Sequence, residues 1–135
     1  GTDAAAVQAD RLQAIETLLE RFGPEVTVLL KGSPSLVAGA HRRLDPSGSS
    51  DLATAGMGDV LAGTIGALIA QGVTSEEAAS LGLWLTSAAA RAAAKGAGLQ
   101  SADIPEYLPA ARAETRAGAP APHAPWVRCD LAASW

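Results

Sequence analysis

The chain has 135 residues, which is enough for one domain with a hydrophobic core. A hydrophobic content of 48% excludes wholesale disorder, and with only 4% aromatic residues the core must rest on Leu, Val and Ile. The formal net charge is −4 and no Lys/Arg cluster is present, which argues against a nucleic-acid surface. An acidic protein of this kind must bind any phosphate locally, with backbone amides and one or two lysines.

The cysteine content and the hydropathy indicate the compartment. Cys129 is the single cysteine, so an internal disulfide framework is excluded and a reducing compartment is expected. We interpret it as a buried or incidental thiol, because no His or Lys lies beside it in the sequence. No signal peptide and no apolar span of about 18 residues is apparent, so we expect a cytoplasmic protein without a membrane partner.

The first predicted element is an amphipathic helix over residues 3–22, which Gly23-Pro24 ends. Its apolar face consists of Leu12, Ile15, Leu19 and Phe22. Residues 26–30 then form a continuous β-branched and apolar run, the pattern of a strand covered on both faces in a parallel sheet. Lys31 follows at the carboxyl end of that strand, where open α/β sheets bind ligands. By itself, a lysine at this place is more often a solvated strand end.

Residues 35–38 and 41–44 read as two short strands around Gly39-Ala40, which predicts a hairpin. The basic run at residues 41–43 could act as a phosphate clamp, but a polar strand edge beside a turn is the favoured interpretation. Residues 45–51 have loop composition and lead into a glycine-rich stretch.

The glycine-rich stretch at residues 53–63 is the main functional signal. It runs into a helical pattern whose large apolar residues recur at helical spacing and which Gly72 closes. Residues 56–58 should therefore lie at or just before a helix start, where backbone N–H groups have no partner inside the helix. These groups and the positive end of the helix dipole make an anion site. Glycine at 56 and 58 removes Cβ atoms that would hold a phosphate away.

Asp59 has two interpretations at this point. It could be a helix cap, which stabilises a helix by about 1 kcal/mol. Alternatively, it could be a base that takes a proton from a hydroxyl while a neighbouring phosphate is transferred.

The string Ala55-Gly-Met-Gly-Asp-Val-Leu-Ala-Gly63 closely resembles the glycine-rich signature of the ADP- or ATP-dependent NAD(P)H-hydrate dehydratases, a family with the ribokinase-like fold. The run Val28-Leu-Leu-Lys-Gly-Ser-Pro-Ser35 resembles that family's strand and Lys-Gly segment, which contacts the nucleotide. The resemblance implies an α/β fold, a ribokinase-like three-layer αβα sandwich. Residues 1–117 would be the C-terminal half of this nucleotide-binding domain, followed by a Pro/Ala-rich tail at residues 118–135.

The resemblance also implies the roles of individual residues. The expected nucleotide-binding residues are Lys31, Gly32, Ser33, Pro34, Ser35, Gly56, Met57 and Gly58. Asp59 would be the catalytic base that deprotonates the hydroxyl of the hydrated nicotinamide in NAD(P)HX. The resulting phosphate ester then eliminates to restore NAD(P)H. The expected cofactors are ADP or ATP and Mg²⁺, and no histidine and acid cluster has the spacing of a metal site, so Mg²⁺ would arrive with the nucleotide.

The sequence departs from the family at two places. Residues 48–50 are Gly-Ser-Ser, where the family usually has an Asn and a Gly-Asn-Pro. The family often has a histidine in the next helix, whereas residues 85–87 here are Leu-Thr-Ser.

Residues 74–77 start a second helix, with a hydroxyl cap followed by acids, and it runs to about Lys95-Gly96. It is apolar almost all round, which predicts burial, and Gly82 would permit close approach to the helix that begins at Asp59. A last helix is expected from Ser101 to about Arg116. An extended linker follows at 119–125, where His123 is incidental, and residues 126–135 could dock on the body or on another copy.

Two other functions stay open. A sugar or vitamin-precursor kinase of the same fold would use the same turn and aspartate, although residues 60–63 favour the dehydratase. A non-catalytic half-domain is also possible, because the chain lacks the N-terminal strands of the family that would bind most of the NAD(P)HX. A short sheet with one exposed edge would then need cover. The expected partners are therefore the NAD(P)HX substrate and either another copy in a homo-oligomer or a missing N-terminal half.

Overall fold

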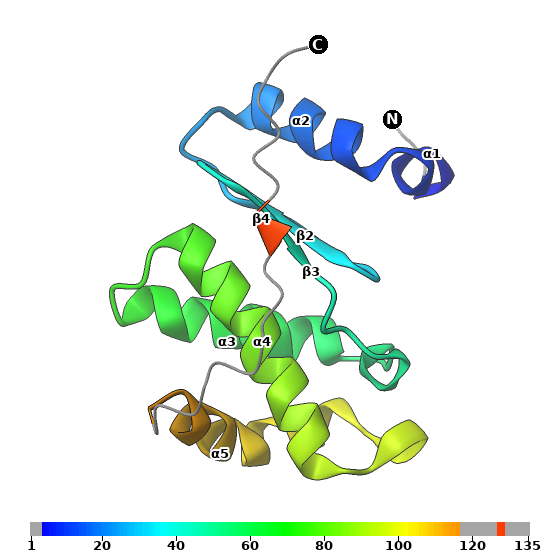
Figure 1. The fold of residues 1–135 in the computed structure, drawn as a ribbon, viewed down its shortest axis with the longest axis vertical. Coiled ribbons are helices and arrows are strands. Elements are labelled where there is room, and N and C mark those ends of the chain that lie inside the picture. Colours follow the sequence, from blue (N-terminus) through cyan, green and yellow to red (C-terminus); the bar gives the residue numbers. More distant parts are fainter. Residues whose placement is uncertain (1–3, 117–126, 129–135) are drawn as a thin grey trace.

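The computed structural model describes residues 4–116 and 127–128. In chain order the elements are α1 (Ala4–Ala9), α2 (Arg11–Phe22), β1 (Val28–Leu30), β2 (Ser35–Ala38), β3 (Arg42–Asp45), α3 (Met57–Ala70), α4 (Ser75–Ala93), α5 (Ile104–Arg116) and β4 (Val127–Arg128). Figure 1 shows α2 on one side of the sheet and α3 and α4 on the other side, with α5 beyond them. The α/β prediction and its three layers are therefore confirmed.

The sheet has the strand order β1-β2-β3-β4, and all three pairings are antiparallel. The expectation that residues 26–30 lie in a parallel sheet is thus wrong for the strand pairings that the structure describes. The connection between β1 and β2, residues 31–34, is too short to cross over a sheet, so β2 must return antiparallel. The hairpin predicted around Gly39-Ala40 is confirmed as β2 and β3.

Both faces of the sheet are covered, and the side chains alternate between them as strand geometry requires. Leu36 and Ala38 of β2 pack with Ile15 of α2. Val37, between them in the sequence, packs on the opposite face with Leu61 of α3 and Leu83 of α4. Coverage of both faces explains the continuous apolar run in β1, a pattern that does not depend on strand direction.

The helix predicted over residues 3–22 is divided in two. Asp10 has non-helical φ and ψ of −142° and 87°, and its carboxylate accepts a hydrogen bond from Gln13 N (2.9 Å). This aspartate therefore caps α2 and separates it from α1. The predicted apolar face is also too wide, since Leu12 and Phe22 are 49% and 60% exposed while Ile15 is buried.

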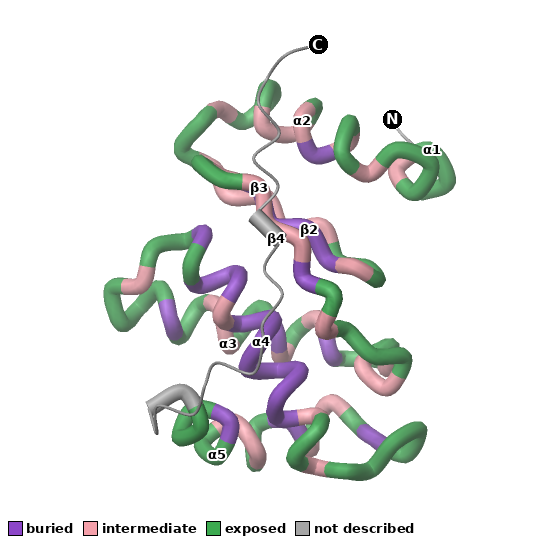
Figure 2. The backbone as a smooth tube through the Cα atoms, viewed as in Figure 1, coloured by how far each residue is buried: buried purple, intermediate pink, exposed green. Residues whose placement is uncertain are grey.

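The buried helix α4 lies at the centre of the molecule, as Figure 2 shows by its run of buried residues. The predicted cap is confirmed, because Thr74 accepts from Glu77 N (3.4 Å). The predicted close approach at Gly82 is also confirmed, because a Cβ atom there would lie 2.6 Å from Ile65 Cγ1 of α3.

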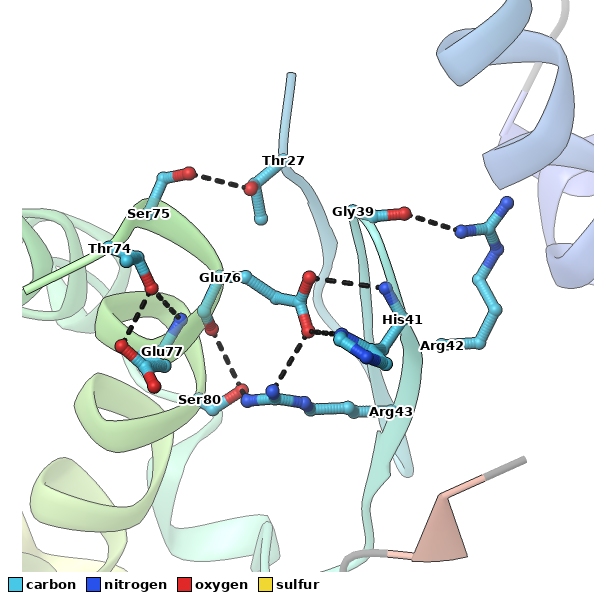
Figure 3. A network of polar contacts seen from close by, with 10 residues as sticks. All are labelled: Thr27, Gly39, His41, Arg42, Arg43, Thr74, Ser75, Glu76, Glu77 and Ser80. Carbon is cyan, nitrogen blue, oxygen red and sulfur yellow. Dashed lines mark hydrogen bonds and ion pairs between the residues drawn. The ribbon is translucent and has the colours of Figure 1, made fainter. Parts of the chain in front are cut away.

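Glu76, one of the acids of the first turn of α4, is buried between α4 and the hairpin (Figure 3). Its carboxylate accepts from the backbone N of His41 (3.2 Å), lies 3.0 Å from His41 Nδ1 and forms an ion pair with Arg43 (2.9 Å). Arg42 forms a two-point ion pair with Glu16 of α2 at 2.7 and 2.8 Å. The basic run at residues 41–43 therefore ties the sheet to both helical layers and does not form a phosphate clamp.

The last predicted helix is confirmed, with a 3-10 turn at Ser101–Asp103 leading into α5. In the C-terminal segment, Val127 and Arg128 pair with β3, so this part docks on the sheet. The predictions for the linker at 119–125, His123 and Cys129 fall outside the described residues.

Candidate functional site

A cavity of about 540 Å³ lies where the end of β1, the loop after β3, the start of α3 and the middle of α4 meet. Six of the residues predicted to bind the nucleotide line it: Lys31, Gly32, Ser33, Ser35, Met57 and Gly58. Pro34, Gly56 and Asp59 are adjacent to them in sequence but do not line the cavity. Folding thus brings the Lys-Gly segment and the glycine turn, which are distant in the chain, to one hollow.

The N-terminus of α3 lies at this cavity through Met57 and Gly58, and Gly56 precedes them in the chain. Gly56 is the N-cap, with a left-handed φ of +79°, and Met57 is the first helical residue. Met57 N already donates to Thr54 O (3.3 Å), and Asp59 N donates to Gly56 O (3.1 Å). Within the described residues, the amides of Gly56 and Gly58 have no hydrogen-bond partner. Two unpaired amides, rather than the three expected, therefore remain for an anion at the positive end of the helix dipole.

The position of Lys31 completes this anion site. A Cβ atom built on Gly58 would lie 2.8 Å from Lys31 Nζ, so the ammonium lies directly against the helix start. Lys31 forms no ion pair with any residue that the structure describes. An uncompensated positive charge beside Gly58, whose amide is free, together with the free amide of Gly56 in the same turn, forms a binding site for a phosphate group.

Asp59 is the third residue of α3 and is exposed. It is not the cap, since Gly56 occupies that position and α3 has no side-chain cap hydrogen bond. The helix-cap interpretation is therefore wrong. Among the described residues nothing forms a hydrogen bond or ion pair with its carboxylate, which leaves that group available beside the anion site.

The loop that carries Lys31 is held from behind by groups the sequence interpretation missed. Arg11 of α2 donates to the carbonyl oxygens of Pro34 (2.7 Å), Leu30 (3.1 Å) and Lys31 (3.3 Å). The buried Ser35 hydroxyl donates to Gly32 O (3.0 Å), and the Ser33–Pro34 peptide is cis. Pro34 and Ser35 thus shape the loop, and no sequence pattern distinguishes Arg11 from the other polar residues of its helix.

Polar residues missed by the sequence interpretation also form the inner wall of the cavity, namely Asp45, Thr86 and Ser87. Asp45 is only 5% exposed and accepts from the backbone N (2.8 Å) and hydroxyl (2.5 Å) of Ser47. Its position as a carboxylate at the end of a predicted short strand was the available signal. The Asp45 carboxylate could accept hydrogen bonds from the polar parts of a nucleotide, and the hydroxyls of Thr86 and Ser87 could donate or accept them.

The far side of the glycine turn is closed by the segment before α5. A Cβ atom on Gly56 would lie 2.6 Å from the hydroxyl of Ser101, so a side chain is excluded there by space as well as by φ. This segment is stabilised by the Lys95–Asp103 ion pair (2.7 Å). The hydrogen bond from Lys95, and then that from Gln100 N, lower the pKa of Asp103, while the same contact raises the pKa of Lys95.

No group of three or more His, Cys, Asp or Glu residues in the described part of the chain is arranged to hold a metal ion. None of the helices there has the length and hydrophobicity needed to cross a membrane.

Comparisons with known proteins give matches over most of the chain. A family model described as NAD(P)H-hydrate dehydratase matches residues 2–110. The chain is 47% identical over 115 residues to the ADP-dependent (S)-NAD(P)H-hydrate dehydratase of Neisseria meningitidis serogroup B, covering 83% of this chain and 38% of that protein. It is 39% identical over 110 residues to the bifunctional NAD(P)H-hydrate repair enzyme Nnr of Vibrio cholerae, covering 81% of this chain and 22% of that protein. The chain therefore spans well under half the length of these relatives.

Proposed function

The chain belongs to the NAD(P)H-hydrate dehydratase family, which has the ribokinase-like fold, and we propose that it carries the phosphate-binding and catalytic part of an ADP- or ATP-dependent enzyme of this kind. Such an enzyme is a carbon–oxygen lyase that repairs hydrated nicotinamide nucleotides. The relative from Neisseria meningitidis is named as ADP-dependent, which favours ADP as the nucleotide.

The observation that carries the proposal is the position of the Lys31 ammonium against Gly58, whose backbone amide is free at the start of α3. Phosphoryl transfer requires mainly positioning and stabilisation of charge on the transferred group. In the proposed site, the Gly56 and Gly58 amides and the Lys31 ammonium hold the terminal phosphate of the nucleotide as its charge spreads. Because these groups are in place before the nucleotide binds, they need no rearrangement at the moment of reaction.

Asp59, next to Gly58, is the proposed base. Its carboxylate takes the proton of the NAD(P)HX hydroxyl as that oxygen bonds to the terminal phosphorus and the phosphorus–oxygen bond to the nucleotide breaks. In the second stage the carbon–oxygen bond of the phosphate ester breaks and a ring proton is lost, which restores the double bond of NAD(P)H.

Mg²⁺ fits the cavity only as an ion that arrives with the nucleotide. Within the described part of the chain the cavity wall carries one carboxylate, Asp45, one of whose oxygens is already engaged by Ser47. Mg²⁺ is commonly held by one or two carboxylates together with substrate phosphates, and bound there it would neutralise phosphate charge.

The experiment is an assay of NADHX turnover with ADP and with ATP, followed by the absorbance of reduced nicotinamide. We expect Asp59→Asn to keep ADP binding by calorimetry nearly intact and to lower turnover by about 10²–10⁴-fold, the usual effect of a general base. Asp51→Asn is the matched control, because it makes the same change outside α3, in the 3-10 turn Ser50–Leu52. Retained turnover in Asp59→Asn would show that Asp59 is not the base.

Product analysis in this assay, sedimentation and ADP calorimetry test the two alternatives. A phosphorylated sugar or alcohol, formed with no recovery of NADH, would indicate a small-molecule kinase. A chain that sediments as a monomer and has no affinity for ADP would indicate a non-catalytic half-domain.

The wider assignments belong to the same proposal. We place residues 1–117 in the C-terminal half of a ribokinase-like domain, residues 118–135 in a tail, and the protein in the cytoplasm. Among the described residues β1 has a partner on one edge only, so an N-terminal half or a second copy would cover the other edge. Sedimentation of the chain alone and with a candidate N-terminal half tests this.

A further inference from the structure

Arg11, the first residue of α2, reaches the loop that joins β1 to β2. Its Nη1 donates to the carbonyl of Pro34 at 2.7 Å, and its Nη2 lies 3.1 Å from the carbonyl of Leu30 and 3.3 Å from that of Lys31. One guanidinium thus contacts the loop on both sides of Gly32. The planar, forked geometry of arginine makes this possible, whereas a lysine ammonium is a single point.

Gly32 is fitted to this guanidinium. A Cβ atom at residue 32 would lie 2.6 Å from Nη2, 2.8 Å from Cζ and 2.9 Å from Nη1 of Arg11. The side chain of Arg11 therefore packs directly against the Gly32 backbone, and any larger residue would push the guanidinium away from the carbonyls.

We propose that Arg11 is a positioning residue of the nucleotide site, which fixes the 30–34 loop so that Lys31 stays over the start of α3. Arg11 does not line the cavity and touches no proposed phosphate position, so it acts through Lys31. The inference rests on the proposed function only in that ADP is the ligand used to measure it.

Anchoring of α2 does not explain the contact. The helix is already tied to the sheet by the ion pair of Glu16 with Arg42 on β3, and by the packing of Ile15 against the sheet. Arg11 also keeps its Nε buried without a partner, an arrangement that is unfavourable by itself. The remaining hydrogen bonds of the guanidinium are all directed to the loop that presents Lys31.

The experiment compares Arg11→Ala and Arg11→Lys with the control Glu16→Gln, which removes the ion pair between α2 and Arg42 of β3. Two quantities are measured on the full chain: the Kd for ADP by calorimetry, and the amide chemical shifts of Lys31, Gly32, Ser33, Ser35 and Gly58 without nucleotide. A loop that is only partly in its binding conformation binds more weakly in proportion to that fraction. We expect about tenfold weaker binding in both Arg11 variants, equivalent to about 1.4 kcal/mol, together with shifted loop amides. Glu16→Gln should change neither quantity.

Each outcome has one meaning. Unchanged loop amides and an unchanged Kd in Arg11→Ala would overturn the positioning role. Weaker binding with unchanged loop amides would also overturn it, because Arg11 would then contact the nucleotide directly. If the original chain has no affinity for ADP, the proposed function fails while the loop amides still decide on Arg11. If Arg11→Ala does not fold, Gly32→Ala displaces the guanidinium without removing it and should shift the same amides.

Discussion

Gly58→Ala is expected to weaken ADP binding without destabilising the protein. Gly58 is the second residue of α3, and a Cβ atom there would meet only Lys31 Nζ, at 2.8 Å. The ammonium is the free end of a flexible side chain and can move away at little cost. Alanine is a better helix former than glycine by up to about 1 kcal/mol, so the free energy of unfolding should stay constant or rise.

The loss of affinity follows from how far the ammonium must move. An ordinary contact between the new methyl group and Nζ is about 3.5–4.0 Å, so the ammonium retreats by about 1 Å. At an effective dielectric constant of about 20, unit charges attract by about 5.5 kcal/mol at about 3 Å and by about 4.2 kcal/mol at about 4 Å. The difference of about 1.4 kcal/mol corresponds to about tenfold weaker binding.

Calorimetric titration with ADP and thermal unfolding measure the two effects on the same sample. Gly63→Ala is the matched control, since it makes the same change in the same helix at a position with nothing within 4 Å of the new Cβ. It should raise the free energy of unfolding by up to about 1 kcal/mol and leave the Kd unchanged. If Gly58→Ala binds ADP as tightly as the original chain, the phosphate does not lie between Lys31 and the start of α3.

Gly82→Ala should destabilise the protein by about 1–3 kcal/mol in urea denaturation, because its Cβ would lie 2.6 Å from Ile65 Cγ1 in a packed interface. Adding Ile65→Ala should cost less than the sum of the two single changes, and strict additivity would contradict the contact. The hydrogen-bonded ion pair with Arg42 lowers the pKa of Glu16. The stability that this pair contributes is therefore fully present above the pKa that Glu16 has in the unfolded chain. It is lost as the pH falls through the pKa that Glu16 has in the folded protein. With the Glu16 side chain 44% exposed, Glu16→Gln should cost about 0.2–1 kcal/mol at neutral pH in chemical denaturation, and this difference should shrink as the pH falls below the ordinary glutamate pKa of 4.5.

Local features of the fold were predictable because each depends on residues close together in the chain. Gly56 and Gly72 mark the limits of α3 through their left-handed φ angles of +79° and +88°. Thr74 caps α4, and Gly82 permits the approach of α3, as expected. The division of the first helix was also visible in principle, because Asp10 followed by Gln13 is a capping pattern that the apolar periodicity obscured.

Long-range features were only partly predictable. The apolar run in β1 indicates that both faces are covered, but the direction of its neighbour follows from the short connection at residues 31–34. The burial of Glu76 depends on His41 and Arg43 of the β2–β3 hairpin, far away in the sequence, which no helical pattern reveals. The sequence pointed to six of the residues that line the cavity, whereas its polar inner wall and the contact of Lys31 with Gly58 required the fold.

The candidate site is held in place by contacts on three sides, none of which needs a ligand. Arg11 holds the loop of Lys31, Ser101 lies against Gly56 from the opposite side, and Met57 anchors the start of α3 in the core. A site assembled in advance loses little conformational entropy on binding, so more of the interaction energy appears as affinity. It also explains why a methyl group added at Gly32 or Gly58 should matter. A side chain at residue 32 would take the space of the Arg11 guanidinium, and one at residue 58 would take the space of the Lys31 ammonium.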